Sequence, residues 1–173
     1  MKRYFFAVML STTAFLLSFS CPDSWFKYTT TQGHCAISFP GKPEESTDTS
    51  RSDNGTPFQI HLATYAPNDN DVYMLGWINM NGFYPEDITM QKILENSRDG
   101  ATNSLGATDV KTIKTNLGNE PYIEFSFEGK DFVGKDRIYV INKFQYSVIT
   151  LFAKRTIIPQ DADKFITSFK YIK

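Results

Sequence analysis

The stretch that decides the fold is FQYSVITLF, residues 144–152, because it is apolar on both faces of an extended chain. Side chains alternate between the two faces of a strand, so Val148 lies opposite Ile149 and Leu151. Residues 71–80, DVYMLGWINM, have the same two-sided pattern. Strands that are apolar on both faces lie in the centre of a sheet, and both faces of that sheet must then be covered.

Shorter segments with alternating or polar side chains accompany these two central strands. We predict further strands at residues 25–30, 35–39, 45–51, 58–62 and 122–128. DNG at 53–55 and NDN at 68–70 are typical turn sequences. Cys35 shares one face of its strand with Ile37 and Phe39, which predicts a buried cysteine that behaves as a small apolar residue.

One long helix is predicted after the first central strand. Its apolar stripe has the spacing of a single helix face and contains Met90, Ile93, Leu94, Ser97, Ala101 and Leu105. Asp87 or Thr89 can cap its start, and Gly106 can end it. Gly100 is a poor helix former, and we expect it to allow close packing of the helix onto the sheet.

A second, shorter helix is predicted to start near Pro159, with Asp161 and Asp163 in its first turn. Its apolar side chains are Phe165, Ile166 and Phe169. The order of elements predicts an α+β fold, a mainly antiparallel β-sheet with helices on both faces. We expect residues 21–173 to form this sandwich as a single domain.

Four segments resemble parts of bacterial PsbP-like domains. They are SFPGKP at 38–43, ILENSRDGA at 93–101, RIYVI at 137–141 and DADKFITSF at 161–169. The resemblance spans nearly all of residues 25–172 and implies an antiparallel sheet sandwiched by helices, a fold shared with a nuclear-transport cofactor. Photosynthetic members of the family are extrinsic subunits that steady a metal-containing photosystem. No functional motif of theirs is matched here, so the resemblance implies no site residues.

The first residues have the pattern of a secretory signal peptide. Lys2 and Arg3 precede an apolar run over residues 4–19, and Ser18 and Ser20 are the small residues expected before a cleavage site. We therefore predict a signal peptide at residues 1–20. The mature protein would be exported, and it would be periplasmic or membrane-anchored in the bacterial cell envelope.

Cys21 would be the first residue of the mature chain, and three fates are open for it. LSFSC at 17–21 resembles a permissive lipobox, which would place a lipid on Cys21. Export also permits a disulfide between Cys21 and Cys35, although the predicted hairpin would force the chain to double back over four residues. The third alternative is a free thiol.

The sequence offers few residues for catalysis or metal binding. It contains two histidines, His34 and His61, and two cysteines, Cys21 and Cys35, without a CxxC or HxxxH pair for zinc. A catalytic pair of His34 and Cys35 is conceivable, but the alternation of residues 35–39 favours a structural cysteine. There is no nucleophile elbow, P-loop or dinucleotide fingerprint. We predict no catalytic, cofactor-binding or metal-binding residues.

Four aromatic residues have two interpretations. Tyr73, Trp77, Tyr139 and Tyr146 could include a ligand-binding surface, because some lie opposite the expected main core. The interpretation that we favour is that they pack in a second layer under the helices. The second interpretation requires them to be buried.

Composition narrows the function without assigning it. The formal net charge is −1, and removal of Lys2 and Arg3 with the signal peptide leaves −3, so a nucleic-acid partner is not expected. No apolar run after residue 21 is long enough to span a membrane, so membrane contact would depend on a lipid on Cys21. We predict an exported, non-catalytic binding or scaffold module with an unknown envelope protein as partner. The alternative is a periplasmic protein that binds a small ligand or lipid in a cleft between sheet and helix.

Overall fold

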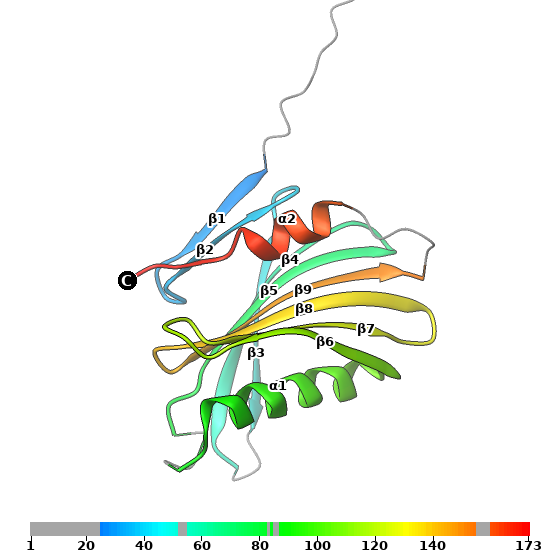
Figure 1. The fold of residues 1–173 in the computed structure, drawn as a ribbon. Helices are drawn as coiled ribbons and strands as arrows, with labels where there is room; N and C mark the ends of the chain where they lie inside the picture. Colours follow the sequence, from blue (N-terminus) through cyan, green and yellow to red (C-terminus); the bar gives the residue numbers. More distant parts are fainter. Residues whose placement is uncertain (1–24, 52–54, 83, 85–86, 155–159) are drawn as a thin grey trace, which may run out of the picture.

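The computed structural model describes residues 25–51, 55–82, 84, 87–154 and 160–173 (Figure 1). The predicted signal peptide, Cys21, most of the DNG turn and Pro159 lie outside these residues. Of the described residues, 55% lie in strands and 17% in helices. The fold is therefore mostly β.

A seven-stranded antiparallel sheet forms the middle layer. In spatial order its strands are β3 (Glu44–Arg51), β4 (Pro57–Asn68), β5 (Asp71–Asn79), β9 (Phe144–Ala153), β8 (Phe132–Ile141), β7 (Tyr122–Glu128) and β6 (Asp109–Asn116). The two strands predicted as central, β5 and β9, are hydrogen-bonded neighbours. Leu75 and Val148 pair in the core on one face, and Met74 and Ile149 pair on the other. The two-sided pattern in the sequence is confirmed.

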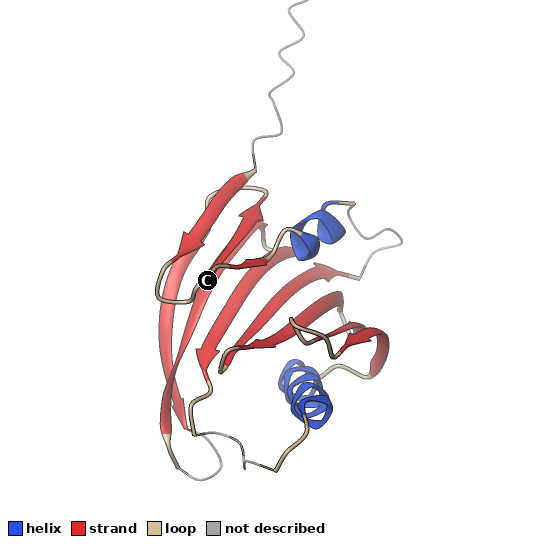
Figure 2. Cartoon of the chain, turned by 60° about the vertical axis from the view of Figure 1, so that its left-hand side comes forward, coloured by secondary structure: helices blue, strands red, loops and turns tan. Residues whose placement is uncertain are grey.

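A second, three-stranded antiparallel sheet covers one face of the large sheet (Figures 1 and 2). It consists of β1 (Phe26–Thr30), β2 (Cys35–Phe39) and β10 (Lys170–Tyr171). Helix α2 (Asp161–Thr167) lies beside it and adds Phe165 and Ile166 to the shared core. Cys35, Ile37 and Phe39 face this core and are at most 1% exposed, which confirms the predicted burial of Cys35.

Helix α1 (Met90–Leu105) packs on the other face of the large sheet, against β7 and β8 (Figure 2). Ile93 and Leu94 from the predicted stripe are buried in this interface. The Thr89 side chain caps the first turn, and Gly106 ends the helix with a φ of 66°, a left-handed conformation that favours glycine. Both ends of the helix agree with the prediction.

The predicted fold class was wrong. We expected an α+β sandwich with helices on both faces, whereas the described residues form a β-rich fold with two antiparallel sheets and two helices. The burial of β5 and β9 on both sides did require cover on both faces. A second sheet can supply that cover as well as a helix can, and the strand pattern of residues 25–39 does not indicate that these strands leave the main sheet.

Other strands were predicted incompletely. β4 extends to Asn68, well beyond the predicted 58–62, and β6, β8 and β10 were given no bounds. In β6 every residue except Asn116 is exposed. No buried apolar face marks this edge strand in the sequence, so the periodicity on which strand prediction depends is missing.

Candidate functional site

Helix α1 covers only part of its face of the large sheet (Figure 2). It packs against β7 and β8, and beside it the same face continues over β4, β5 and β9. A cavity of about 690 Å³ lies there, between the helix and these strands. We call this cavity the α1 groove. The residues that line it include Phe58, Leu62, Gly76, Gly100, Gln145 and Ser147. Four other cavities among the described residues are smaller, at about 250–420 Å³.

The floor of the α1 groove is apolar. Phe58, Ile60 and Leu62 alternate along β4, and Met74 and Ile78 come from β5. All five side chains are half-buried, so water reaches them in the absence of a ligand. A partly exposed apolar floor in a concave site is typical of a small-molecule binding site.

Small residues keep the groove open on two sides. Along α1 the wall consists of Ser97, Gly100, Ala101 and Ser104, which share one helix face. Gly100 was expected to allow close packing, and this was wrong, because a Cβ there would meet no atom within 4 Å. On the floor, a Cβ at Gly76 would first meet the flexible end of Leu62 at 3.3 Å. The two glycines therefore leave space that a ligand can occupy.

The open surroundings of Gly100 lead to a stability prediction. The Gly100→Ala variant is expected to be more stable than wild type by about 0.5–1 kcal/mol, because alanine loses less backbone entropy in a helix and its methyl group meets no clash. Urea unfolding followed by circular dichroism would measure the change. A loss of stability would show that the added methyl group clashes with a neighbouring atom, and would contradict the open space around Gly100.

Polar groups lie at one side of the groove, where β9 runs beside α1. Ser97 Oγ lies 2.8 Å from Gln145 Oε1 and 2.9 Å from Ile93 O, and its single proton can be donated to either oxygen. Ser147 Oγ donates to Asp136 Oδ2 over 2.9 Å. Ser147 is also paired directly with Gly76 in the register of β5 and β9. Because Gly76 has no side chain, nothing on β5 separates the Ser147 hydroxyl from the groove.

Asp136 lies behind Ser147 and does not line the groove. It is fully buried, and its Oδ1 has no hydrogen-bond partner among the described residues. Burial raises the pKa of this carboxyl from 3.8 to about 7, and the hydrogen bond from Ser147 opposes part of that rise. We therefore expect this acid to make the stability of the fold depend on pH below about 7.

The cysteine and histidine candidates do not form a catalytic site. Burial raises the pKa of Cys35 to about 12, so the thiolate needed by a nucleophile does not form near neutral pH. The His34 ring packs against Phe144, with 5.6 Å between ring centroids. Within the described ranges, no group of three or more His, Cys, Asp or Glu residues is placed to hold a metal ion. Cys21 is not among the described residues, and its three fates stay predictions.

The four aromatic residues singled out in the sequence are core residues. Tyr73, Trp77, Tyr139 and Tyr146 are at most 6% exposed, in the core between the two sheets. The packing interpretation is confirmed, with a sheet as well as a helix above them. The four residues do not together form a ligand-binding surface; among them, Trp77 also borders the α1 groove.

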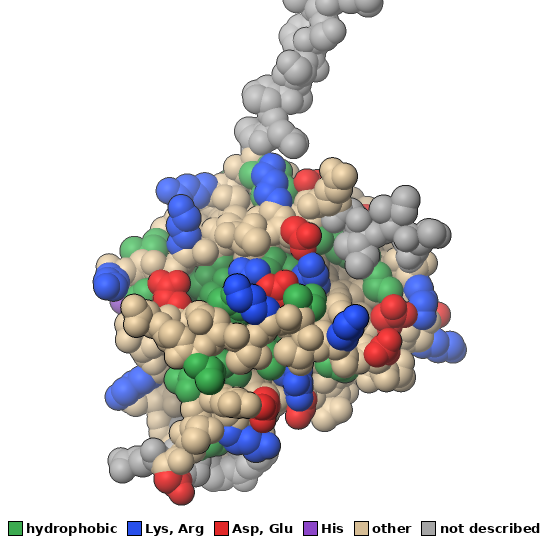
Figure 3. All heavy atoms as spheres, viewed as in Figure 1, with side chains coloured by type: hydrophobic (Ala, Val, Ile, Leu, Met, Phe, Trp, Pro, Cys, Tyr) green, Lys and Arg blue, Asp and Glu red, His purple; other side chains and the backbone are tan. Residues whose placement is uncertain are grey.

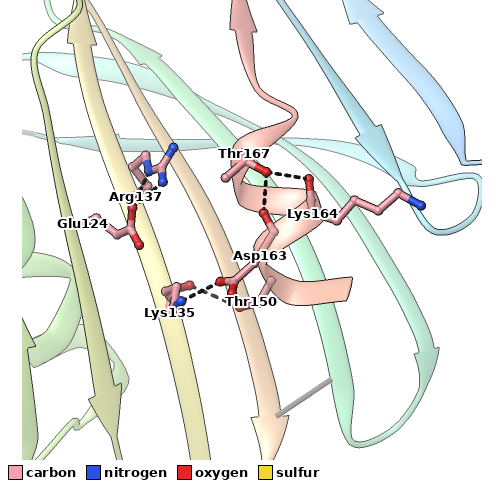
Figure 4. Close-up of polar contacts among 7 residues, drawn as sticks. All are labelled: Glu124, Lys135, Arg137, Thr150, Asp163, Lys164 and Thr167. Atoms are coloured by element: carbon pink, nitrogen blue, oxygen red, sulfur yellow. Dashed lines mark hydrogen bonds and ion pairs between the residues drawn. The ribbon is translucent and has the colours of Figure 1, made fainter. Parts of the chain in front are cut away.

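Two ion pairs lie on the face of the large sheet opposite the α1 groove (Figure 4). Arg137 Nε on β8 donates to Glu124 Oε2 on β7 over 2.8 Å. Lys135 Nζ on β8 donates to Asp163 Oδ1 on α2 over 2.6 Å. Figure 3 shows positive and negative side chains interspersed over the surface in that view. These pairs join neighbouring strands and dock α2, which is a structural role.

Two features of the sequence indicate the groove, although the sequence analysis did not predict it. Gly76 interrupts an apolar strand, and an isolated glycine in a strand marks a place where another group approaches closely. The small residues of α1 recur at helical spacing, at positions 97, 100, 101 and 104. Neither signal indicates that these two features face each other across a cavity.

Comparison with known proteins assigns this chain to no family. No protein-family model matches the chain, and no curated protein matches it either. Among the described helices, none is both long enough and apolar enough to cross a membrane.

Proposed function

We propose that this protein is a non-catalytic binding protein of the bacterial cell envelope that holds a small apolar ligand in the α1 groove. One observation carries the proposal: the groove has an apolar, half-buried floor, and none of its described lining residues is charged. Its volume of about 690 Å³ suits a small molecule, since such sites typically measure roughly 300–1,000 Å³.

The compartment in this proposal comes from the sequence. The signal peptide predicted at residues 1–20 supports export, and the lipobox-like LSFSC supports a lipid on Cys21. The resemblance to PsbP-like domains supports a role without catalysis. All three stay predictions.

The other role predicted from the sequence, a scaffold acting through protein contacts, has less support. A sheet usually recruits a protein strand at an exposed edge, and the edges of the large sheet are β3 and β6. β6 carries Lys111 and Lys114 and has a bulge between Thr112 and Lys114. Edge lysines and bulges discourage pairing of β6 with another strand. Glu44, Glu45 and Asp48 put charged side chains on β3, which also discourage pairing, so we place the function in the groove.

Filling the groove tests this proposal. N-phenyl-1-naphthylamine, an uncharged apolar dye that fluoresces when removed from water, is expected to bind the wild-type protein. Gly76→Leu adds a side chain from the floor, and Gly100→Leu adds one from the helix wall. Each variant is expected to bind the dye at least tenfold more weakly, because the new side chain occupies the space of the ligand.

Two smaller substitutions serve as matched controls. Gly76→Ala and Gly100→Ala change the same backbone positions but leave most of the volume free, so they should retain dye binding within about threefold, or less than 1 kcal/mol. Circular dichroism of all four variants would show that the fold is kept. Equal dye affinity in the leucine variants and in wild type, or no binding by wild type, would refute the proposal.

A further inference from the structure

The polar groups of Ser147 and Gln145, which β9 presents to the groove beside α1, define the class of ligand. We propose that the α1 groove selects uncharged amphiphiles that carry a hydroxyl group, such as a long-chain alcohol or a monoacylglycerol, and that Ser147 and Gln145 bind this hydroxyl. The inference deepens the proposed function and rests on it.

Ser147 presents a hydrogen-bond acceptor to the groove. A hydroxyl group has one proton and two lone pairs, and Ser147 gives its proton to Asp136 Oδ2. Its remaining capacity is that of an acceptor. The pairing of Ser147 with Gly76 across β5 and β9 leaves this oxygen accessible from the groove.

Gln145 presents a hydrogen-bond donor nearby. Its Oε1 lies within hydrogen-bond distance of the Ser97 hydroxyl, at 2.8 Å, and its Nε2 has no hydrogen-bond partner among the described residues. Gln145 and Ser147 lie two residues apart on the same face of β9, about 7 Å along the strand. The long Gln145 side chain can reach the group that contacts Ser147.

A hydroxyl group matches both residues at once. It can donate to Ser147 Oγ and accept from Gln145 Nε2, while an alkyl chain attached to it lies on the apolar floor formed by Leu62, Met74 and Ile78. A purely apolar ligand would leave both polar groups desolvated without a partner, which carries a penalty. The site therefore favours a hydroxyl over a methyl end.

The charge of the site disfavours ionic ligands. No described residue that lines the groove carries a charge that could pair with a carboxylate or an ammonium group. A carboxylate would also lack a proton to give to Ser147, and the nearest buried acid, Asp136, would repel it. An ammonium group would have to give up its water without reaching Asp136, which lies behind Ser147 and is fully buried.

Displacement of the bound dye measures this selectivity. At pH 8, 1-decanol, decanoate and decylammonium have the same chain length but are neutral, negative and positive. We expect 1-decanol to displace N-phenyl-1-naphthylamine at a concentration at least tenfold lower than either ion. Equal or stronger displacement by decanoate or decylammonium would overturn the inference while leaving the groove as a binding site. Failure of the dye to bind wild type would instead overturn the proposed function.

Two substitutions locate the selectivity at the proposed residues. Ser147→Ala and Gln145→Met each remove one hydrogen-bonding group, and each is expected to reduce the preference for 1-decanol over decanoate to less than about threefold. Gln145→Met keeps the side-chain length and does not touch Asp136, so it tests the inference even if Ser147→Ala folds poorly. Ser126→Ala is the matched control, because Ser126 is a half-buried serine on β7 that does not line the groove. A preference unchanged in both test variants would overturn the assignment.

Discussion

Replacing Asp136 with asparagine is expected to change how the stability of the protein depends on pH. Burial raises the pKa of this carboxyl to about 7, whereas an unfolded chain releases the same proton near its ordinary value of about 3.9. Between these two values the folded state holds one more proton than the unfolded state. The unfolding free energy of wild type should therefore fall as pH rises through this window, and level off above it.

The expected slope from this single group is roughly 1 kcal/mol per pH unit between about pH 4 and pH 7. The Asp136→Asn variant has no proton to release, so its stability relative to wild type should increase across the same window and stay constant above it. Urea unfolding at several pH values would measure the difference. Other acids contribute to both proteins and cancel in the comparison.

Ser147→Ala is the matched variant for this experiment. The hydrogen bond from Ser147 lowers the pKa of Asp136, so its removal should move the upper end of the window to higher pH. A difference between wild type and Asp136→Asn that is constant from pH 4 to pH 9 would contradict the prediction. It would show that Asp136 titrates alike in the folded and unfolded chains.

Truncation of Phe165 is expected to give the largest loss of stability. This α2 side chain is 0% exposed, and its ring lies 4.9 Å from the ring of Phe39 on β2 and 5.4 Å from that of Tyr73 on β5. It therefore joins the small sheet to the large one. Phe165→Ala should lower the unfolding free energy by about 3–5 kcal/mol, a large part of the roughly 5–15 kcal/mol typical of a domain.

Chemical unfolding would test this, with two reference variants on the same helix. Phe165→Leu keeps most of the volume and should lose less than half as much stability as Phe165→Ala. Thr167 is exposed, so Thr167→Ala should change the stability by no more than about 0.5 kcal/mol. Because the α1 groove lies on the opposite face, folded Phe165→Ala protein should still bind the apolar dye. A loss below 1 kcal/mol in Phe165→Ala would show that α2 does not join the two sheets.

The groove was harder to predict from the sequence than helix α1, which forms one of its walls. The bounds of α1 were predicted correctly because Thr89, Gly106 and the apolar stripe act within a few residues of each other. Gly100 was assigned to close packing because a glycine on an apolar helix face usually has that role. Its actual surroundings depend on where the helix lies on the sheet, which is set by contacts between residues far apart in the chain.

Local periodicity established the two central strands, the long helix with its caps and the burial of Cys35. Each depends on the alternation of side chains or on hydrogen bonds between near neighbours, which a single sequence displays directly. Tertiary structure alone decided that β1, β2 and β10 form a separate sheet, that this sheet covers one face of β5 and β9, and that α1 leaves β4 and β5 open on the other. Burial requires only that an apolar face be covered, and it does not specify which element covers it or how far that element extends.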